Sequence, residues 1–173
     1  MCMKYKQKEV TGYPETLKEM FRLAEEYQWD LLPFQELTPE QFFEMVKNLK
    51  FRKDPMQVEH VSRPAIILDP LWGGPRDCDD KATAVIAMVK MQRALNNKRW
   101  PHHVRAVVSG NSLNGLGFYF PHHVYTEVLI NGWWEPYDVT FPENKIGQRL
   151  YTIADGSEPF REVFEEDGRR WSA

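Results

Sequence analysis

Cys78 stands where a turn-rich loop meets a long apolar segment. The residues at 72–77 read Trp-Gly-Gly-Pro-Arg-Asp, and Ala82, Val85 and Val89 follow the cysteine at helical spacing. A thiol in the first turn of a buried helix faces the positive end of the helix dipole, which favours the thiolate. Because the thiolate is the form that attacks carbonyl carbon, Cys78 is a candidate nucleophile.

Charged neighbours of this cysteine act in opposite directions. Asp77, Asp79 and Asp80 place negative charge beside the thiol and oppose its ionisation. Arg76 and Lys81 are close enough in the sequence to offset part of that charge. The local sequence therefore leaves two alternatives open, an activated nucleophile or a buried structural cysteine without reactivity. A catalytic role needs a base from elsewhere in the chain.

A hairpin signal downstream places a histidine near an aspartate. The dipeptide Asn-Gly at 131–132 is typical of a two-residue type I′ turn, which sets Ile130 opposite Trp133. In that register His123 and Asp138 are diagonal neighbours on one face of the sheet, within reach of a side-chain hydrogen bond. A slip of one residue would bring the preceding histidine to this face instead, so the register is an assumption of the argument.

A histidine oriented by a carboxylate and a cysteine at a helix start are together the groups that thiol acyl transfer uses. In this chemistry the histidine accepts the thiol proton, and the aspartate fixes the imidazole and stabilises its protonated form. The thiolate attacks a carbonyl to give a thioester, which water or an amine then resolves. Without the cysteine, His123 and Asp138 read as a polar pair on a half-exposed sheet.

Three segments resemble the transglutaminase-like superfamily, in the form found in its small bacterial and phage members. They read, in chain order, Asp-Cys78-Asp-Asp-Lys-Ala, then His123-Val-Tyr-Thr-Glu-Val, then Trp134 and Asp138-Val-Thr. Upstream, Gln57-Val-Glu-His-Val-Ser-Arg-Pro is similar to the segment that precedes the cysteine motif in these members. The likeness covers roughly residues 40–142.

This resemblance implies an α+β fold of the papain-like type, in which the helix that carries the nucleophile packs on an antiparallel sheet. It implies a triad in which Cys78 attacks, His123 is general base and then acid, and Asp138 orients the histidine. The implied reaction is acyl transfer on the amide of a peptide or protein, without a cofactor: peptide or isopeptide hydrolysis, or amidase or transglutaminase-type chemistry. The aspartate after Cys78 departs from the cross-linking enzymes of animals, where an aromatic residue usually follows.

The alternative is a catalytically silent protein of the same fold, for example a structural or assembly module of a phage particle. The aspartates around the cysteine favour this alternative, whereas the three triad residues in the right order oppose it. We expect residues 1–37 to be a helical extension of a transglutaminase-like domain at 38–173, within one compact domain overall. The extension is a candidate docking surface for an assembly partner.

Acyl transfer also requires donors aimed at the developing oxyanion. The backbone N–H of Cys78 is one candidate, and the indole N–H of Trp72 is the candidate side-chain donor. Gln57 competes with Trp72, whose side chain is as readily interpreted as a hydrophobic lid. Tyr125 shares a strand face with His123 and is a candidate substrate contact.

Hydrophobic periodicity places these residues on a coarse set of elements. Helices are expected at 14–27, from a capping box at Thr38-Pro-Glu-Gln through about 49, at 78–96 and, shorter, near 159–166. Strands are expected at 104–109, 122–130 and 133–140, with mostly loop and a short extended piece at 51–77 and a glycine-rich loop at 110–117. Hairpin-linked strands after helices indicate an antiparallel sheet and hence an α+β domain.

Composition excludes several classes of protein. The chain has 173 residues, of which 42% are hydrophobic and 13% aromatic, a share that a disordered chain does not reach. A net charge of −3 argues against electrostatic nucleic-acid binding, and no apolar run is long enough for a membrane span. The two cysteines are too few for a disulfide framework. The basic start has no apolar run after it, so we expect a cytoplasmic protein, or a virion protein if it is phage-encoded.

A metal site is also not expected. The adjacent histidines at 102–103 and at 122–123 would point to opposite faces of a strand. Each pair therefore offers at most one ligand to a given site, and neither HxH nor HxxxH spacing occurs.

Overall fold

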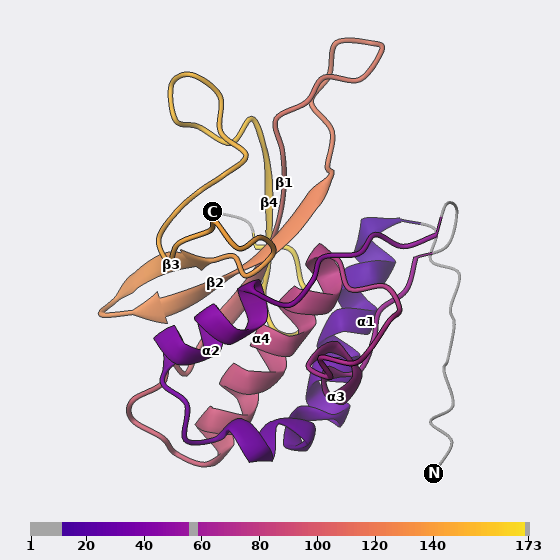
Figure 1. Cartoon of the computed structure of the whole chain (residues 1–173). Coiled ribbons are helices and arrows are strands. Elements are labelled where there is room, and N and C mark those ends of the chain that lie inside the picture. Colours follow the sequence, from indigo (N-terminus) through magenta and orange to yellow (C-terminus); the bar gives the residue numbers. More distant parts are fainter. Residues whose placement is uncertain (1–11, 56–58, 172–173) are drawn as a thin grey trace.

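The computed structural model describes residues 12–55 and 59–171, in which helices precede and cover a four-stranded sheet (Figure 1). The helical elements are α1 (Tyr13–Glu26), the 3₁₀ helix η1 (Gln28–Phe34), α2 (Pro39–Lys47), α3 (Pro64–Ile67) and α4 (Cys78–Ala94). The strands are β1 (Val104–Gly110), β2 (His123–Ile130), β3 (Trp133–Tyr137) and β4 (Phe160–Phe164). This is an α+β architecture, as the order of elements in the sequence predicts.

The sheet is antiparallel throughout, with strand order β3-β2-β1-β4. Ile130 pairs with Trp133 across the turn, and Asn131 and Gly132 both have positive φ, as a type I′ turn requires. The predicted register of this hairpin is therefore confirmed. The second strand ends at Tyr137 rather than near 140, so Asp138 lies just beyond the ladder.

Helix α4 is the central helix and lies against the sheet (Figure 1), whereas α2 packs directly on β3 through the rings of Phe43 and Tyr137. All of its residues from 79 to 92 are buried, because α1, η1 and α3 pack on it from outside and β1 and β2 from inside. Its apolar side chains form one core with those of α1 and with the sheet face that includes Val108 and Val124. The first residue of this central helix is Cys78.

The first helices belong to the same core. Leu17, Met20 and Phe21 of α1 are buried against α4, so the helix within the predicted N-terminal extension packs as part of the main hydrophobic core. At the start of α2, Thr38 accepts a hydrogen bond from the backbone of Gln41, whose side chain accepts one from the backbone of Thr38. The predicted capping box is thus present.

The expected short helix near 159–166 is wrong, since this segment forms strand β4. Its side chains alternate in the manner of a strand buried on both faces. Phe160 and Phe164 pack on the main core, whereas Val163 belongs to a small cluster on the other face with Val107 and Tyr125. Pairing with β4 also satisfies the backbone groups on the free edge of β1, which a helix packed there would leave without partners.

The connection from β1 to β2 approaches the sheet closely. A Cβ on Gly110 would lie 1.9 Å from the carbonyl oxygen of Phe120, so glycine is required there. The loop between them extends beyond the sheet (Figure 1) and exposes Leu116 and Phe118. Within the described residues, no helix is both long and apolar enough to cross a membrane.

Candidate active site

Cys78 lies at the N-terminus of α4 and lines a cavity of about 700 Å³. The thiol is partly buried, and Asp77 is the extended residue that precedes the helix. Side chains of α1, of the loop around Asp54 and of the start of β2 complete the lining. Because the first N–H groups of a helix have no partner within it, this position also offers backbone donors to a ligand.

His123 and Asp138 face each other beside this cavity. The Nε2 atom of His123 lies 2.8 Å from Oδ2 of Asp138, and both side chains are buried. This contact leaves the Nδ1 atom of the ring without a bond to Asp138, and Cys78 is near enough to raise the pKa of the ring. The structure therefore brings together the three residues that the sequence singles out, from α4, the start of β2 and the end of β3.

Charge favours the protonated form of this histidine. Burial is the largest influence on the pKa of His123 and lowers it, but the hydrogen bonds and negative charges of Asp138 and Cys78 together raise it to about 10. Burial acts to raise the pKa of Asp138, and the charge and hydrogen bond of His123, with hydrogen bonds from Thr140, bring it below its ordinary value. At neutral pH the pair is an imidazolium held by a carboxylate.

A buried lysine holds the loop that carries the aspartate. Lys81, one turn after the cysteine, donates from Nζ to the carbonyl oxygens of Leu49 at 2.7 Å, Thr140 at 2.8 Å and Lys47 at 3.2 Å. Thr140 in turn donates its backbone N–H to Oδ1 of Asp138 at 3.0 Å. Helix α4 and the loop with Asp138 are thus tied together by the side chain of Lys81, which the sequence suggests only as a counter-charge to the aspartates.

Two aromatic rings enclose the histidine. The centroid of the Tyr151 ring lies 4.2 Å from the centroid of the His123 ring. The ring of Tyr125 stacks on the His123 ring with 5.9 Å between centroids. Burial and the charges of Asp138 and Cys78 raise the pKa of Tyr151 to about 12, so its hydroxyl stays protonated near the site. Tyr151 lies in an irregular loop with no periodic pattern, and nothing in the sequence points to it.

The side-chain polar groups of Tyr125 and Trp72 bond to groups outside the cavity. The hydroxyl of Tyr125 donates to the carboxylate of Glu158, and neither Tyr125 nor Trp72 lines the cavity. The indole N–H of Trp72 donates to the carbonyl of Pro75 within its own loop, at 3.3 Å. Gln57, the other candidate oxyanion donor, falls outside the described residues.

The chain matches no known protein family, no curated protein and no solved structure with which it was compared. Arguments about function therefore rest on the geometry of the site.

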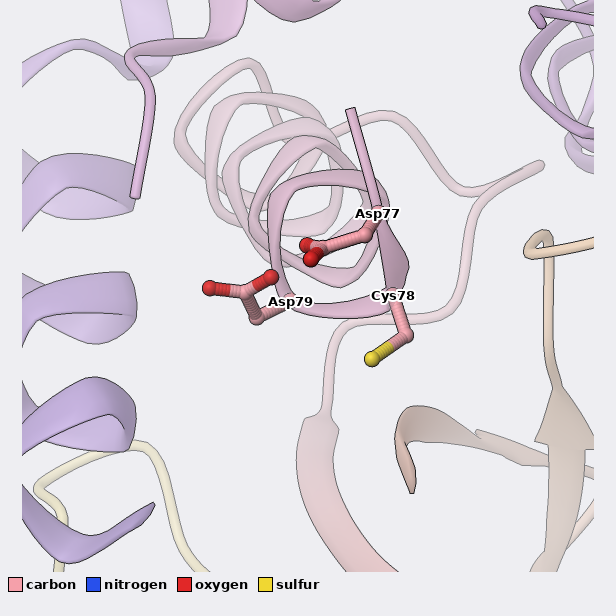
Figure 2. Close-up of side chains that lie close together, drawn as sticks. All are labelled: Asp77, Cys78 and Asp79. Atoms are coloured by element: carbon pink, nitrogen blue, oxygen red, sulfur yellow. The ribbon is translucent and has the colours of Figure 1, made fainter. Parts of the chain in front are cut away.

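Carboxylates crowd the start of α4. Figure 2 shows Asp77 and Asp79 with their carboxylates turned toward each other beside Cys78. One ligand atom of each of these three residues lies within 4.8 Å of the other two, so the group has the side chains for a metal ion. Asp79 is 2% exposed, and among the described residues neither of its oxygens has a hydrogen-bond donor. Asp80, equally buried, accepts the backbone N–H of Ser62 at 2.7 Å.

This arrangement predicts that Asp79 makes the protein less stable as the pH rises. Burial, followed by a hydrogen bond and charge from Asp77, raises the pKa of Asp79 well above its ordinary value. The folded state then binds a proton that the unfolded state releases above about pH 4, so stability falls as the pH rises from there. We expect Asp79→Asn to raise the free energy of unfolding at pH 8 by about 1–3 kcal/mol.

Urea unfolding at pH 5 and pH 8 measures this difference. The increase in the free energy of unfolding caused by Asp79→Asn should be much smaller at pH 5, where a larger fraction of the wild-type carboxyl is protonated. Asp155→Asn is the matched control, because Asp155 is exposed and bonds only within its own turn. Equal effects of Asp79→Asn at both pH values would contradict the argument.

Proposed function

We propose that this protein catalyses thiol-dependent acyl transfer on amide bonds, with the triad Cys78, His123 and Asp138 of a transglutaminase-like, papain-type enzyme. The observation that carries the proposal is that Cys78 and His123 line one cavity and act on each other, while His123 is hydrogen-bonded to the buried Asp138 behind it. A buried imidazolium between a thiol and a carboxylate has no packing purpose, whereas thiol catalysis needs this order of groups. The substrate class is a peptide or protein amide.

Acylation follows from the charges of the resting site. In the resting site His123 already holds the proton that the thiol has given up, and the thiolate of Cys78 attacks the amide carbonyl to form a carbon–sulfur bond. The negative oxygen of the tetrahedral intermediate is stabilised by backbone N–H groups at the start of α4. When the carbon–nitrogen bond breaks, the imidazolium of His123 gives its proton to the departing amine, and a thioester remains on Cys78.

Deacylation needs the histidine to become a base, and the thioester provides the reason. Two of the influences that raise the pKa of His123 are the hydrogen bond and the charge of Cys78, and both are lost when the sulfur is acylated. The pKa of the imidazole therefore falls in the acyl-enzyme, and the neutral ring can accept a proton from water or an amine. That nucleophile attacks the thioester, and the thiolate leaves.

One observation favours the alternative of a silent module with the same fold. Two carboxylates flank the cysteine, and negative charge beside a sulfur disfavours the thiolate. A silent module would keep Cys78 as an unreactive thiol, and His123 would not affect it.

Alkylation of the thiol by iodoacetamide distinguishes the two. In a Cys2→Ser background, Cys78 of the native protein should alkylate rapidly at pH 7, and His123→Ala should slow this by about ten- to a hundredfold, because the thiolate loses its cation. His103→Ala is the control, since His103 is an exposed loop residue. A slow reaction that is indifferent to His123→Ala would rule out the enzyme.

A further inference from the structure

The cavity beside Cys78 has an excess of acidic side chains. Asp54, Glu59, Asp77 and Asp79 all line it, and they come from the loop before α3 and from the start of α4. Besides the two histidines of the β2 end, Lys53 is the basic side chain among the described residues of the lining. A ligand in this cavity therefore meets a surplus of acidic groups, which a positively charged ligand would allow to ionise.

One of these carboxylates lacks the partner that its burial demands. Asp79 is 98% buried and lines the cavity, and its two oxygens have no donor among the described residues. Within the described part of the chain, the carboxylate of Asp77 is the neighbour with which Asp79 can share a hydrogen bond, and that bond exists only when one of the two is protonated. Burying a charge without donors is costly, so a ligand that brings donors and positive charge is favoured here.

Two other acidic side chains of the lining, Asp54 and Glu59, also have raised pKa values. Burial and the charge of Asp77 raise the pKa of Asp54 to about 6, although a hydrogen bond from the backbone of His60 opposes the shift. Burial and the charges of Asp77 and Asp54 likewise raise the pKa of Glu59. Mutual repulsion thus keeps these acids from ionising freely, and the half charge at the start of a helix is too small to offset several carboxylates. A bound cation would remove the repulsion.

The apolar part of the lining suits an organic cation with an aliphatic stem. Tyr13, Leu17 and Met20 of α1 line the same cavity as the carboxylates, and the hydroxyl of Thr16 between them lies 3.5 Å from the carboxylate of Glu59. Arginine and lysine side chains lay their methylene groups along apolar surface and keep the charged end on polar groups. The volume of about 700 Å³ also exceeds what a bare metal ion needs.

We propose that the substrate carries a positively charged side chain, a guanidinium or an ammonium, which enters this cavity next to the scissile amide and pairs with Asp79. The proposal rests on the proposed function and names its substrate class as a basic peptide. A divalent ion held by Asp77, Cys78 and Asp79 is the competing occupant, and it would occupy the sulfur and block acylation.

Charged thiol reagents test the proposal without a known substrate. In the Cys2→Ser background, Cys78 is modified by a methanethiosulfonate that carries a trimethylammonium group or by one that carries a sulfonate. In both cases the thiolate forms a disulfide and methanesulfinate leaves. We expect the cationic reagent to react faster by about tenfold or more relative to the anionic one. Asp79→Asn and, separately, Asp54→Asn should each reduce this ratio several-fold, and Asp155→Asn should leave it unchanged.

Protection supplies the second measurement. N-acetyl-arginine amide should slow alkylation of Cys78 by iodoacetamide, whereas the neutral N-acetyl-citrulline amide should not. Equal protection by the two amides, or a reagent ratio that neither aspartate variant changes, would overturn the proposal. So would protection by Zn²⁺ alone, which would assign the carboxylates to a metal. Each of these results leaves a His123-dependent thiol intact, so failure here is distinct from failure of the proposed function.

Discussion

Asp138→Asn is expected to slow turnover of p-nitrophenyl acetate by on the order of 10²–10⁴-fold, because the histidine loses the group that keeps it charged and oriented. The hydrogen bond and charge of Asp138 are the largest of the influences that raise the pKa of His123 to about 10. Without them, burial dominates and lowers the pKa of the ring toward or below its ordinary value of about 6.5. The imidazole then loses its proton at neutral pH.

The histidine signals in an NMR pH titration measure this change directly. In the wild type, His123 should stay protonated up to about pH 9, and in Asp138→Asn it should titrate near or below neutral pH. Asp155→Asn is the matched control for both turnover and titration. A variant with unchanged titration of His123 would contradict the assigned role of Asp138, whatever its turnover.

The ion pair between His123 and Asp138 also makes the stability of the protein depend on pH. The pKa of His123 is higher in the folded state than in the unfolded state, so its stabilisation is complete below about pH 6.5 and is lost as the pH rises through about 10. Asp138 has the opposite sign, because its pKa is lowered, and its stabilisation is lost only in acid. Asp138→Asn should therefore destabilise the protein most between these limits.

Lys81→Met is expected to lower the free energy of unfolding by about 3–5 kcal/mol, because it leaves buried acceptors without a donor. The lysine nitrogen now satisfies the carbonyls of Lys47, Leu49 and Thr140, and the bond to Thr140 is buried while the other two are partly buried. Methionine has a similar length but donates nothing. Urea unfolding at pH 7 measures the loss, with exposed Lys98→Met as the control.

The dependence of stability on pH is a second property that distinguishes Lys81 from an apolar core residue. Burial and the charge of Arg76 lower the pKa of Lys81 to about 8, with Asp138 opposing the shift. The folded state thus binds fewer protons than the unfolded state between about pH 8 and 10.5, which makes the contribution of Lys81 to stability increase with pH in that interval. Lys81→Met should abolish this contribution. A loss of less than about 1 kcal/mol, or an unchanged pH dependence, would contradict the role of Lys81 as the buried link.

Local rules explain the parts of this molecule that the sequence predicts. The turn at 131–132 specifies the pairing of its hairpin, and the alternation of side chains then places His123 and Asp138 together. The start of α4 follows from the loop before Cys78 and the apolar residues after it. The chemistry of the three side chains can be read from these local patterns.

Features that depend on distant segments are the ones that the sequence does not reveal. The five residues of β4 carry apolar side chains at spacings that fit either a short helix or a strand, and the free edge of β1 decides between them. Tyr151 reaches His123 through an irregular loop. The unpartnered state of Asp79 depends on how α1 and the loop near Asp54 close over it.

The close approach of the Phe120 backbone to Gly110 limits which substitutions the protein can tolerate. Its missing side chain lets the backbone of Phe120 touch the end of β1, and the strand with His123 begins three residues later. Even an alanine would push the two backbones apart and displace the histidine without altering any group that reacts. The tip of the loop, by contrast, can change in length or sequence without moving the contact between Gly110 and Phe120. Its residues Leu116 and Phe118 are exposed outside the sheet. Evolution can therefore vary the tip freely only while Gly110 stays glycine.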